Sequence, residues 1–529
     1  MLPSESHGNA SLPSPSGLIG IPRRFWILFM GGLGLMISYA DRSNMAVAIV
    51  AIAREYNYNK SEQGLILAAF FIGYILTPIL GGSLADKHGG KMVLATGALI
   101  WTLFTALTSL AAGWGLVWMV LVRIGLGLGE GVAYPSVHAL IGAWIPPCER
   151  SKAVAMITAF SYLGAVIALP TSSALVVSSW GWRSIFWLFG AMGLSWSAIW
   201  QIWGSSSPKT CKRLLLRERR WILQQQRLEQ EANGHSRRSE ELEERGESSE
   251  DEEEGGTAPS FIPDSNTIAY QPVRSSEERL TQNPARLDLT ILATAPSSTS
   301  LADVHKPATP WKALLLRREV WAIIISQFCN SLGFFVMQSW LPTFYLDYYG
   351  VDVGKIGYFS VVPSIAQGTM GFVAGFLGDK AVKDWGWQTL TVRRVSQALG
   401  SVGLGVFLLL AVKLAKDATT AMIIITVGMA INGFTMIGAS AYQHDFCPQH
   451  AGFIFSLGNT AGTIPGLVGV FLVGFLLDKN RNEKGGDTVG GMDDKARWNL
   501  IWTFVCFFYL FGSSVFVILS TNKKFPRTI

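Results

Sequence analysis

Twelve apolar runs, each long enough to cross a lipid bilayer, constrain this 529-residue chain more than any other feature of its sequence. A transmembrane helix needs about 20 mostly apolar residues to span the hydrocarbon core. Only 15% of the residues are charged, against about a quarter in ordinary soluble domains, which disfavours a soluble enzyme. The runs cover residues 25–53, 63–85, 92–112, 115–145, 153–178, 184–203, 320–341, 356–377, 395–414, 421–442, 452–477 and 498–520. The sequence therefore predicts an all-α integral membrane protein with twelve transmembrane helices.

Basic residues gather on one face of the predicted bundle. They precede the first run, follow even-numbered runs and close the chain, at Arg23, Arg24, Lys87, Lys91, Arg150, Lys152, Arg213, Arg217, Lys380, Arg393, Lys523 and Arg527. Because short cytosolic loops carry an excess of Lys and Arg, we expect this face and both termini in the cytosol. The same pattern explains the net charge of +6, so we expect no nucleic-acid partner. An internal membrane (Golgi, vacuole or lysosome, vesicle, plastid) and the plasma membrane both stay open.

A long polar stretch separates two sets of six runs. We therefore expect a cytosolic tail over residues 1–24, a six-helix bundle over 25–203, a cytosolic loop over 204–310, a second bundle over 311–520, and a tail over 521–529. The loop begins with a basic helical stretch, expected to lie at the membrane surface, and continues through acidic and Ser/Thr/Pro-rich tracts. Such a composition predicts disorder for most of it. A solvated linker is the simpler interpretation, and a regulatory role stays open.

Charged residues inside the apolar runs are the candidates for function. Arg123 lies about eight residues into the fourth run, and inserting an unpaired arginine at mid-membrane costs at least about 2.5 kcal/mol. Glu130 follows two turns later on the same face, about 10 Å along the axis. Small residues between them permit close packing and a wide polar lumen. The pair Asp41-Arg42 lies deep in the first run, and a local ion pair that breaks the helix is the alternative interpretation there.

A glycine-rich loop follows the second run, Gly81-Gly82-Ser83-Leu84-Ala85-Asp86-Lys87-His88-Gly89-Gly90-Lys91. It resembles the loop signature of the major facilitator superfamily, and a degenerate copy around Asp379 follows the eighth run. The repeat implies two pseudo-symmetric six-helix bundles, the major facilitator fold. Glycines allow a tight turn and close helix approach, and Asp86 is expected to cap or pair at a helix end. The candidate gating residues are Gly82, Asp86, Lys87, Gly89, Lys91, Asp379 and, just after the tenth run, Asp445.

Further motifs make the resemblance more specific. Residues 41–45, 130–136, 144–151, 339–344 and 456–466 are similar to the anion:cation symporter branch of the superfamily, solute-carrier family 17 and its plant phosphate-transporting relatives. Leu67 and Asn330 stand where glutamate carriers have histidine and arginine, and Leu126 stands where sialin-like members have an acid. These departures disfavour glutamate and sialic acid. The arginine usual in the tenth-helix motif is also missing.

The resemblance implies a secondary active transporter of inorganic phosphate or a small organic anion, by alternating access. The coupling ion stays open between H⁺ and Na⁺, with membrane potential as another driving force. A vesicular-type nucleotide or carboxylate carrier is the closest alternative, and a non-transporting receptor on the same scaffold is less favoured. We expect no enzyme activity, cofactor or metal, because no catalytic constellation or metal-ligand spacing occurs. The expected partners are a small anionic substrate and the lipid bilayer, and the chain is expected to be a monomer.

The candidate substrate-binding residues are Arg42, Arg123, Tyr74, Tyr134 and Asn459. Guanidinium groups are expected to hold a dianion with paired hydrogen bonds. Glu130 is the candidate proton-coupling residue, because an anion bound at Arg123 removes part of the positive field that keeps the carboxylate charged. A permanent ion pair between Arg123 and Glu130 is the structural alternative.

Overall fold

The computed structural model describes residues 22–211, 213–228, 311–447, 451–478, 494–523 and 525. The chain divides into two units, residues 230–309 and the remainder. All of the smaller unit lies outside the described residues, and so do most of the expected central loop and most of both expected tails.

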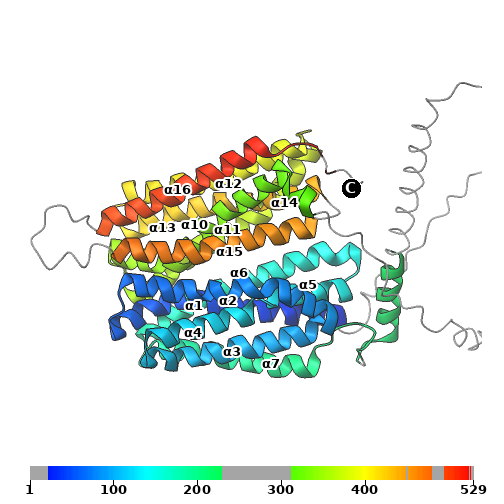
Figure 1. The fold of residues 1–529 in the computed structure, drawn as a ribbon, viewed down its shortest axis with the longest axis horizontal. Helices are drawn as coiled ribbons and strands as arrows, with labels where there is room; N and C mark the ends of the chain where they lie inside the picture. The colour runs from blue at the N-terminus through cyan, green and yellow to red at the C-terminus, as the bar shows by residue number, and fades with distance from the viewer. Residues whose placement is uncertain are drawn as a thin grey trace, which may run out of the picture. The chain divides into compact units, whose positions relative to one another are not determined.

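The first half of the helical unit contains six membrane-spanning segments (Figure 1). The fourth is broken at Gly131 and Val132 into two helices. The helices are α1 (Arg23–Tyr56), α2 (Lys60–His88), α3 (Gly90–Trp114), α4 (Leu116–Glu130), α5 (Ala133–Trp144), α6 (Pro147–Val177) and α7 (Arg183–Trp203). A further helix over residues 216–228 follows α7.

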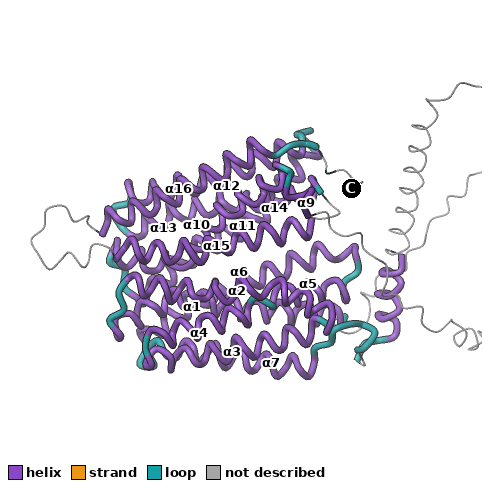
Figure 2. The backbone as a smooth tube through the Cα atoms, viewed as in Figure 1, coloured by secondary structure: helices purple, strands orange, loops and turns teal. Residues whose placement is uncertain are grey.

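The second half repeats this plan. A short helix precedes it, and its fourth span is broken by a 3₁₀ segment. The elements are α9 (Trp311–Leu315), α10 (Arg318–Tyr349), α11 (Val353–Lys383), α12 (Thr389–Leu414), α13 (Ala418–Asn432), η3 (Gly433–Ile437), α14 (Ala439–Phe446), α15 (Ala451–Asp478) and α16 (Asp494–Leu519). Within the described residues, helices joined by loops and turns are the only regular secondary structure (Figure 2). The prediction of twelve spanning helices is confirmed.

Helices α1–α7 pack among themselves, and so do α10–α16. Across the halves, α2 packs on α15, α6 packs on α11, and α1 packs on α10 and α11. Figure 1 shows the blue and cyan first half beside the green to red second half. We call the end where α1 begins and α2 terminates the inner end, and the opposite end the outer end.

Specific contacts join the halves at the outer end and in the middle. At the outer end, the Nζ atom of Lys60 on α2 lies 2.5 Å from an Asp347 carboxylate oxygen on α10. Also at this end, the Gly357 N–H on α11 donates to Ser173 Oγ on α6 at 2.8 Å. In the middle, the rings of Phe71 and Phe335 lie 4.7 Å apart. The first two contacts hold the outer ends of the two halves together.

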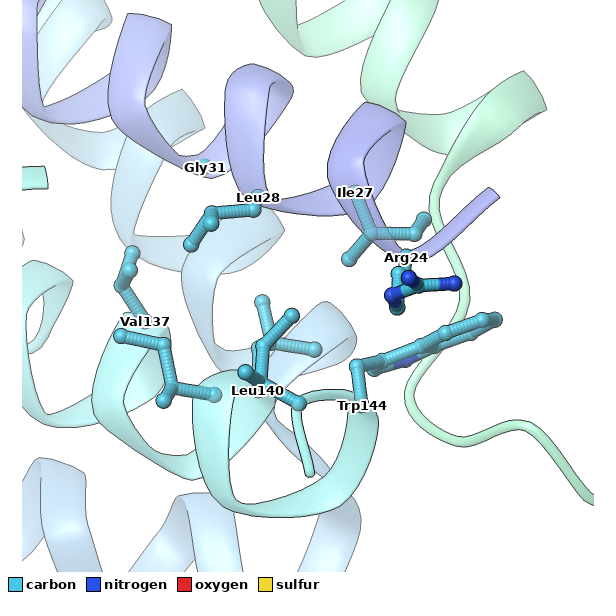
Figure 3. A pocket seen from close by; sticks show the side chains of 9 residues that line it. Arg24, Ile27, Leu28, Gly31, Val137, Leu140 and Trp144 are labelled. Atoms are coloured by element: carbon cyan, nitrogen blue, oxygen red, sulfur yellow. The ribbon is translucent and has the colours of Figure 1, made fainter. Parts of the chain in front are cut away.

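Arg24 fastens the inner end of α1 to the rest of its half. It is 1% exposed, and its guanidinium lies 2.9 Å from Glu149 on α6 and 3.4 Å from Glu218 on the helix 216–228. Glu218 also accepts the backbone N–H groups of Arg23 and Arg24, which α1 leaves without intrahelical partners. Figure 3 shows Arg24 beside Trp144 of α5, at the edge of a mostly apolar cavity. That cavity holds no more than about one water molecule, so it is a packing defect rather than a substrate site.

Candidate functional site

The glycines of α4 bring this helix against α2 and α3. A Cβ atom at Gly129 would lie 2.6 Å from the Trp101 backbone nitrogen of α3, and one at Gly127 would overlap the Phe70 carbonyl of α2. The close packing predicted for this stretch is confirmed. At these glycines the neighbouring helices fill the space that the missing side chains leave. The fourth span breaks directly after Glu130, which fixes that carboxylate at the end of α4.

Glu130 forms an ion pair with Arg42 of α1. Arg42 Nη2 donates to Glu130 Oε2 at 3.2 Å, and the two side chains are 8% and 0% exposed. The alternative of an Arg123–Glu130 ion pair is wrong in this conformation, because two helical turns separate these residues while α1 presents Arg42 at the level of Glu130. The alternative of a helix break at Asp41-Arg42 is also wrong, since α1 continues to Tyr56.

Three aromatic rings surround the Arg42 guanidinium. Its central carbon lies 4.8 Å from the ring centroid of Tyr39, 4.6 Å from that of Phe70 and 4.7 Å from that of Tyr74. Such distances favour a cation over the ring faces. The rings orient the guanidinium, and Tyr74, one of the predicted binding residues, therefore lies directly beside Arg42.

Arg123 is buried at 2% exposure, and its guanidinium lies over the Phe70 ring at 5.5 Å. Its Nε and Nη1 atoms have no hydrogen-bond partner among the described residues. A buried charged donor without a partner is costly in free energy. Unused donors of this kind indicate that a ligand or water completes the site.

Asp41 is the fourth buried charged residue of this site, and it was not selected as a candidate site residue from the sequence. It is 1% exposed, and it lies close enough to Arg123 and Glu130 to interact with both electrostatically. Thr105 of α3 is also close, but neither carboxylate oxygen has a well-formed hydrogen bond among the described residues. The signal was available, because Asp41 is an acid within an apolar run, but the adjacent arginine suggested a local pair.

A small cavity lies between the arginines and the second half. It is lined by Arg42, Ala46, Leu67, Phe70, Phe71, Arg123, Gln338 and Ser339. Gln338 on α10 also donates to Ser43 Oγ on α1 at 3.4 Å. The cavity has room for about one water molecule, so an anion requires movement of the surrounding helices or side chains. The site thus faces the interface between the halves.

The other two predicted binding residues lie further away. The ring centroids of Tyr134 on α5 and Tyr39 lie 5.9 Å apart, and the Tyr134 hydroxyl shares a hydrogen bond with Ser161 at 2.9 Å. Tyr134 therefore lies beside one of the three rings around Arg42. Asn459 lies on α15, does not line this cavity, and accepts the Thr463 hydroxyl at its backbone carbonyl. The structure therefore brings Arg42, Arg123, Tyr74 and Glu130 together and leaves Asn459 apart.

The predicted gating residues occupy inner helix ends. Gly89 joins α2 and α3 with φ +86°, a conformation that favours glycine, and Lys91 donates to the Gln201 carbonyl at 2.9 Å. Asp445 pairs with Arg393 of α12 at 2.7 Å. Asp86 and Asp379 are exposed and have no ion-pair partner within the described ranges, so the expected cap or pair at Asp86 is not observed. Gly82 is half-buried, and Lys87 is exposed.

These features define a multi-pass membrane protein of two similar helical halves with buried charges at their interface. The model of the Major Facilitator Superfamily matches residues 31–470. The chain belongs to this superfamily. Its expected fold is confirmed.

Characterised relatives align over nearly the whole chain. An ascorbate transporter from Arabidopsis thaliana chloroplasts is 28% identical over 95% of this chain and 76% of its own length. A sodium-dependent phosphate transport protein from the same source is 27% identical over 97% of this chain and 83% of its own length. Sheep sialin is 25% identical over 94% of this chain and 90% of its own length. The resemblance to the anion-transporting branch is confirmed.

Solved structures show the same fold at low identity. A bacterial homologue of the human lysosomal transporter Spinster, in an inward-facing and occupied conformation, superposes with a TM-score of 0.66 at 14% identity, covering 95% of this chain and 97% of that one. A D-xylose–proton symporter gives a TM-score of 0.59, also at 14% identity, covering 92% and 97%.

Proposed function

We propose that this chain is a secondary active transporter of a small anion that binds at Arg42 and Arg123. The observation that carries the proposal is the buried Arg123 guanidinium, whose Nε and Nη1 donors have no partner among the described residues beside the interface of the two halves. An anion supplies the acceptors that these donors lack. The named substrates of the relatives, phosphate and ascorbate, support inorganic phosphate or a small organic anion.

The proposed coupling step uses Glu130 and Arg42. In the described conformation Glu130 holds one Arg42 donor. An anion that binds Arg42 competes with Glu130 for that donor, so the carboxylate loses its counter-charge in a buried site. Protonation of Glu130 then becomes favourable and couples proton uptake to anion binding. This route replaces the expected coupling through Arg123, and Na⁺ remains the alternative coupling ion.

The proposed conformation is inward-facing, supported by the contacts between halves at the outer end. Lys60 and Asp347, together with Gly357 and Ser173, join the halves there. Movement to an outward-facing state has to separate these pairs. The inner end is proposed to face the cytosol, because the basic residues of the sequence gather there.

Proteoliposome uptake tests the proposed function. The full chain is reconstituted, and uptake of labelled phosphate, ascorbate, glutamate and ATP is measured under separately imposed pH, sodium and voltage gradients. We expect saturable uptake of at least one anion, driven by one of the gradients. The absence of uptake and of counterflow for every anion, in protein that is correctly folded, would contradict transport and favour a receptor on this scaffold.

A further inference from the structure

The helix over residues 216–228 is held to the inner end of the first half by one of its faces. Glu218 is 4% exposed and accepts the first backbone N–H groups of α1. Trp221 lies under the Arg24 guanidinium at 4.6 Å, and Ile222 is fully buried. Gln226 donates to the Ala143 carbonyl of α5 at 3.0 Å. These contacts fix the rotation of the helix and therefore fix which side chains face outward.

The outward side of this segment carries a group of exposed cations and leucines, which we call the basic face. It consists of Lys209, Arg213, Leu215, Leu216, Arg217, Arg220 and Arg227. Leu215 and Leu216 are 63% and 67% exposed. Glu218 is the only carboxylate in residues 209–228, and it is turned inward. Among the described residues none of these cations forms an ion pair, so no described carboxylate compensates the positive charge of the basic face.

The position of Arg213 places the basic face at the membrane boundary. Its guanidinium lies over the Trp203 ring at 4.7 Å and donates to the Ile202 carbonyl at 3.3 Å, where α7 ends. Trp203 and Ile202 are exposed, and tryptophan is enriched at the level of lipid headgroups. The green helix following α7 runs across the direction of the spanning helices (Figure 1). Basic and apolar side chains on one exposed side are typical of a helix lying in the headgroup region.

We propose that the basic face binds anionic phospholipid headgroups of the leaflet at the inner end. Cationic side chains near the surface attract anionic headgroups, and Leu215 and Leu216 provide apolar contact for the acyl region below them. The chain's own acidic runs, residues 240–244 and 251–254, carry the same negative charge as the lipid and are the competing occupant. Those runs lie outside the described residues, and they offer no acyl chains for the leucines to contact. An anionic lipid therefore fits both the cations and the leucines of the basic face.

The test measures lipid binding by the purified full chain in a neutral detergent. Dioleoyl-phosphatidylglycerol or dioleoyl-phosphatidylcholine is titrated, and native mass spectrometry gives the apparent affinity. The test variant is Arg213→Gln/Arg217→Gln/Arg220→Gln. The matched control is Lys355→Gln/Lys413→Gln/Lys416→Gln, which removes three exposed cations at the outer end. Arg213→Lys/Arg217→Lys/Arg220→Lys keeps the charge.

We expect the glutamine variant to bind phosphatidylglycerol about tenfold more weakly, while the control is unchanged and the lysine variant keeps most of the affinity. Phosphatidylcholine binding should not change, and millimolar inorganic phosphate should not displace the lipid. Equal phosphatidylglycerol affinity in wild type and the glutamine variant would overturn the proposal. If the phosphatidylglycerol affinities of wild type and the glutamine variant differ only after residues 240–254 are deleted from both, the acidic segment occupies the basic face. That result would also overturn the lipid proposal.

Discussion

The two halves use buried polar groups differently in the middle of their spans. There the first half buries four charged side chains, Asp41, Arg42, Arg123 and Glu130, and several of their polar atoms have no hydrogen-bond partner within the described ranges. The second half pairs neutral side chains there: among others, Gln367 donates to Asn432 at 2.8 Å and Gln397 donates to Ser401 at 2.9 Å. Its buried charges Glu319 and Arg497 lie in the first turns of α10 and α16 and have hydrogen-bond partners.

The difference is sharpest at the broken fourth span of each half. In the first half, α4 ends at Glu130, whose ion pair with Arg42 an incoming anion can replace. In the second half, Asn432 at the end of α13 accepts from Gln367 and donates to the Gly400 carbonyl at 3.1 Å. A satisfied neutral network stabilises a fold, while unsatisfied charges cost stability and are typical of function. This difference supports the proposal that the first half recognises the anion, while the amide network of the second half holds its broken helix in place.

Arg123→Lys should give the largest loss of transport. The ammonium keeps the charge but cannot form the paired hydrogen bonds of a guanidinium. Loss of a charge-assisted hydrogen bond of about 1.5–3 kcal/mol predicts uptake about 10- to 100-fold slower at low substrate concentration. Arg183→Lys, at an exposed ion pair with Glu55, is the control and should stay near wild type. Wild-type uptake by Arg123→Lys would reassign Arg123 to a structural role.

Glu130→Gln should separate binding from coupling. If Glu130 carries the coupled proton, anion counterflow survives in this variant, while accumulation driven by a pH gradient disappears. One coupled proton supplies about tenfold accumulation per unit of pH gradient, so the difference is measurable. Uptake is measured in proteoliposomes with and without the gradient. Accumulation that persists in the variant would rule out the proton role, and lost counterflow would support a purely structural pair with Arg42.

Asn432→Ala should reduce stability rather than change the substrate. It leaves the buried Gln367 amide without its acceptor, which costs about 1–3 kcal/mol in the free energy of unfolding. Arg123→Leu, which removes a buried charge with unsatisfied donors, should cost less stability or even raise it. Thermal unfolding of the two purified variants makes the comparison. A larger loss for Arg123→Leu than for Asn432→Ala would contradict the division of roles between the halves.

Reversing one charge of the outer ion pair should shift the conformational balance modestly. Lys60→Asp or Asp347→Lys places like charges across the halves and should favour outer-end opening. A partly exposed pair is worth about 0.2–1 kcal/mol, so distances between spin labels at the outer end should report a population change of at most about fivefold. The combined Lys60→Asp/Asp347→Lys variant should restore the wild-type distribution. Failure of this rescue would show that the pair does not join the halves.

Deleting residues 240–300 should have the smallest effect. Their composition predicts no packed core, and the two halves contact each other through their helices. Uptake by protein that reaches the membrane should stay within about threefold of wild type. Complete loss of uptake in correctly inserted protein would assign the segment an essential role.

The spans could be predicted from the sequence because bilayer thickness imposes length and apolarity on every one of them. Arg42, Arg123 and Glu130 were also identifiable, since charge inside an apolar run is rare. The partner of Glu130 was not, because residue spacing describes one helix, whereas the packing of α1 beside α4 decides which arginine reaches the carboxylate. The amide network of the second half was missed for a related reason. Gln367, Gln397 and Asn432 carry no charge and so did not stand out as candidates, and only the folded arrangement shows which groups they pair with.

A cryo-electron microscopy structure of the full chain with its transported anion tests the central claim most directly. The anion is the one that accumulates in the uptake assay. The account predicts density for the anion against the guanidinium groups of both Arg42 and Arg123, with Arg42 moved away from the 3.2 Å ion pair that it forms with Glu130 here. Anion density held by the second half alone, with the Arg42–Glu130 pair intact and Arg123 still without a partner, would contradict the account.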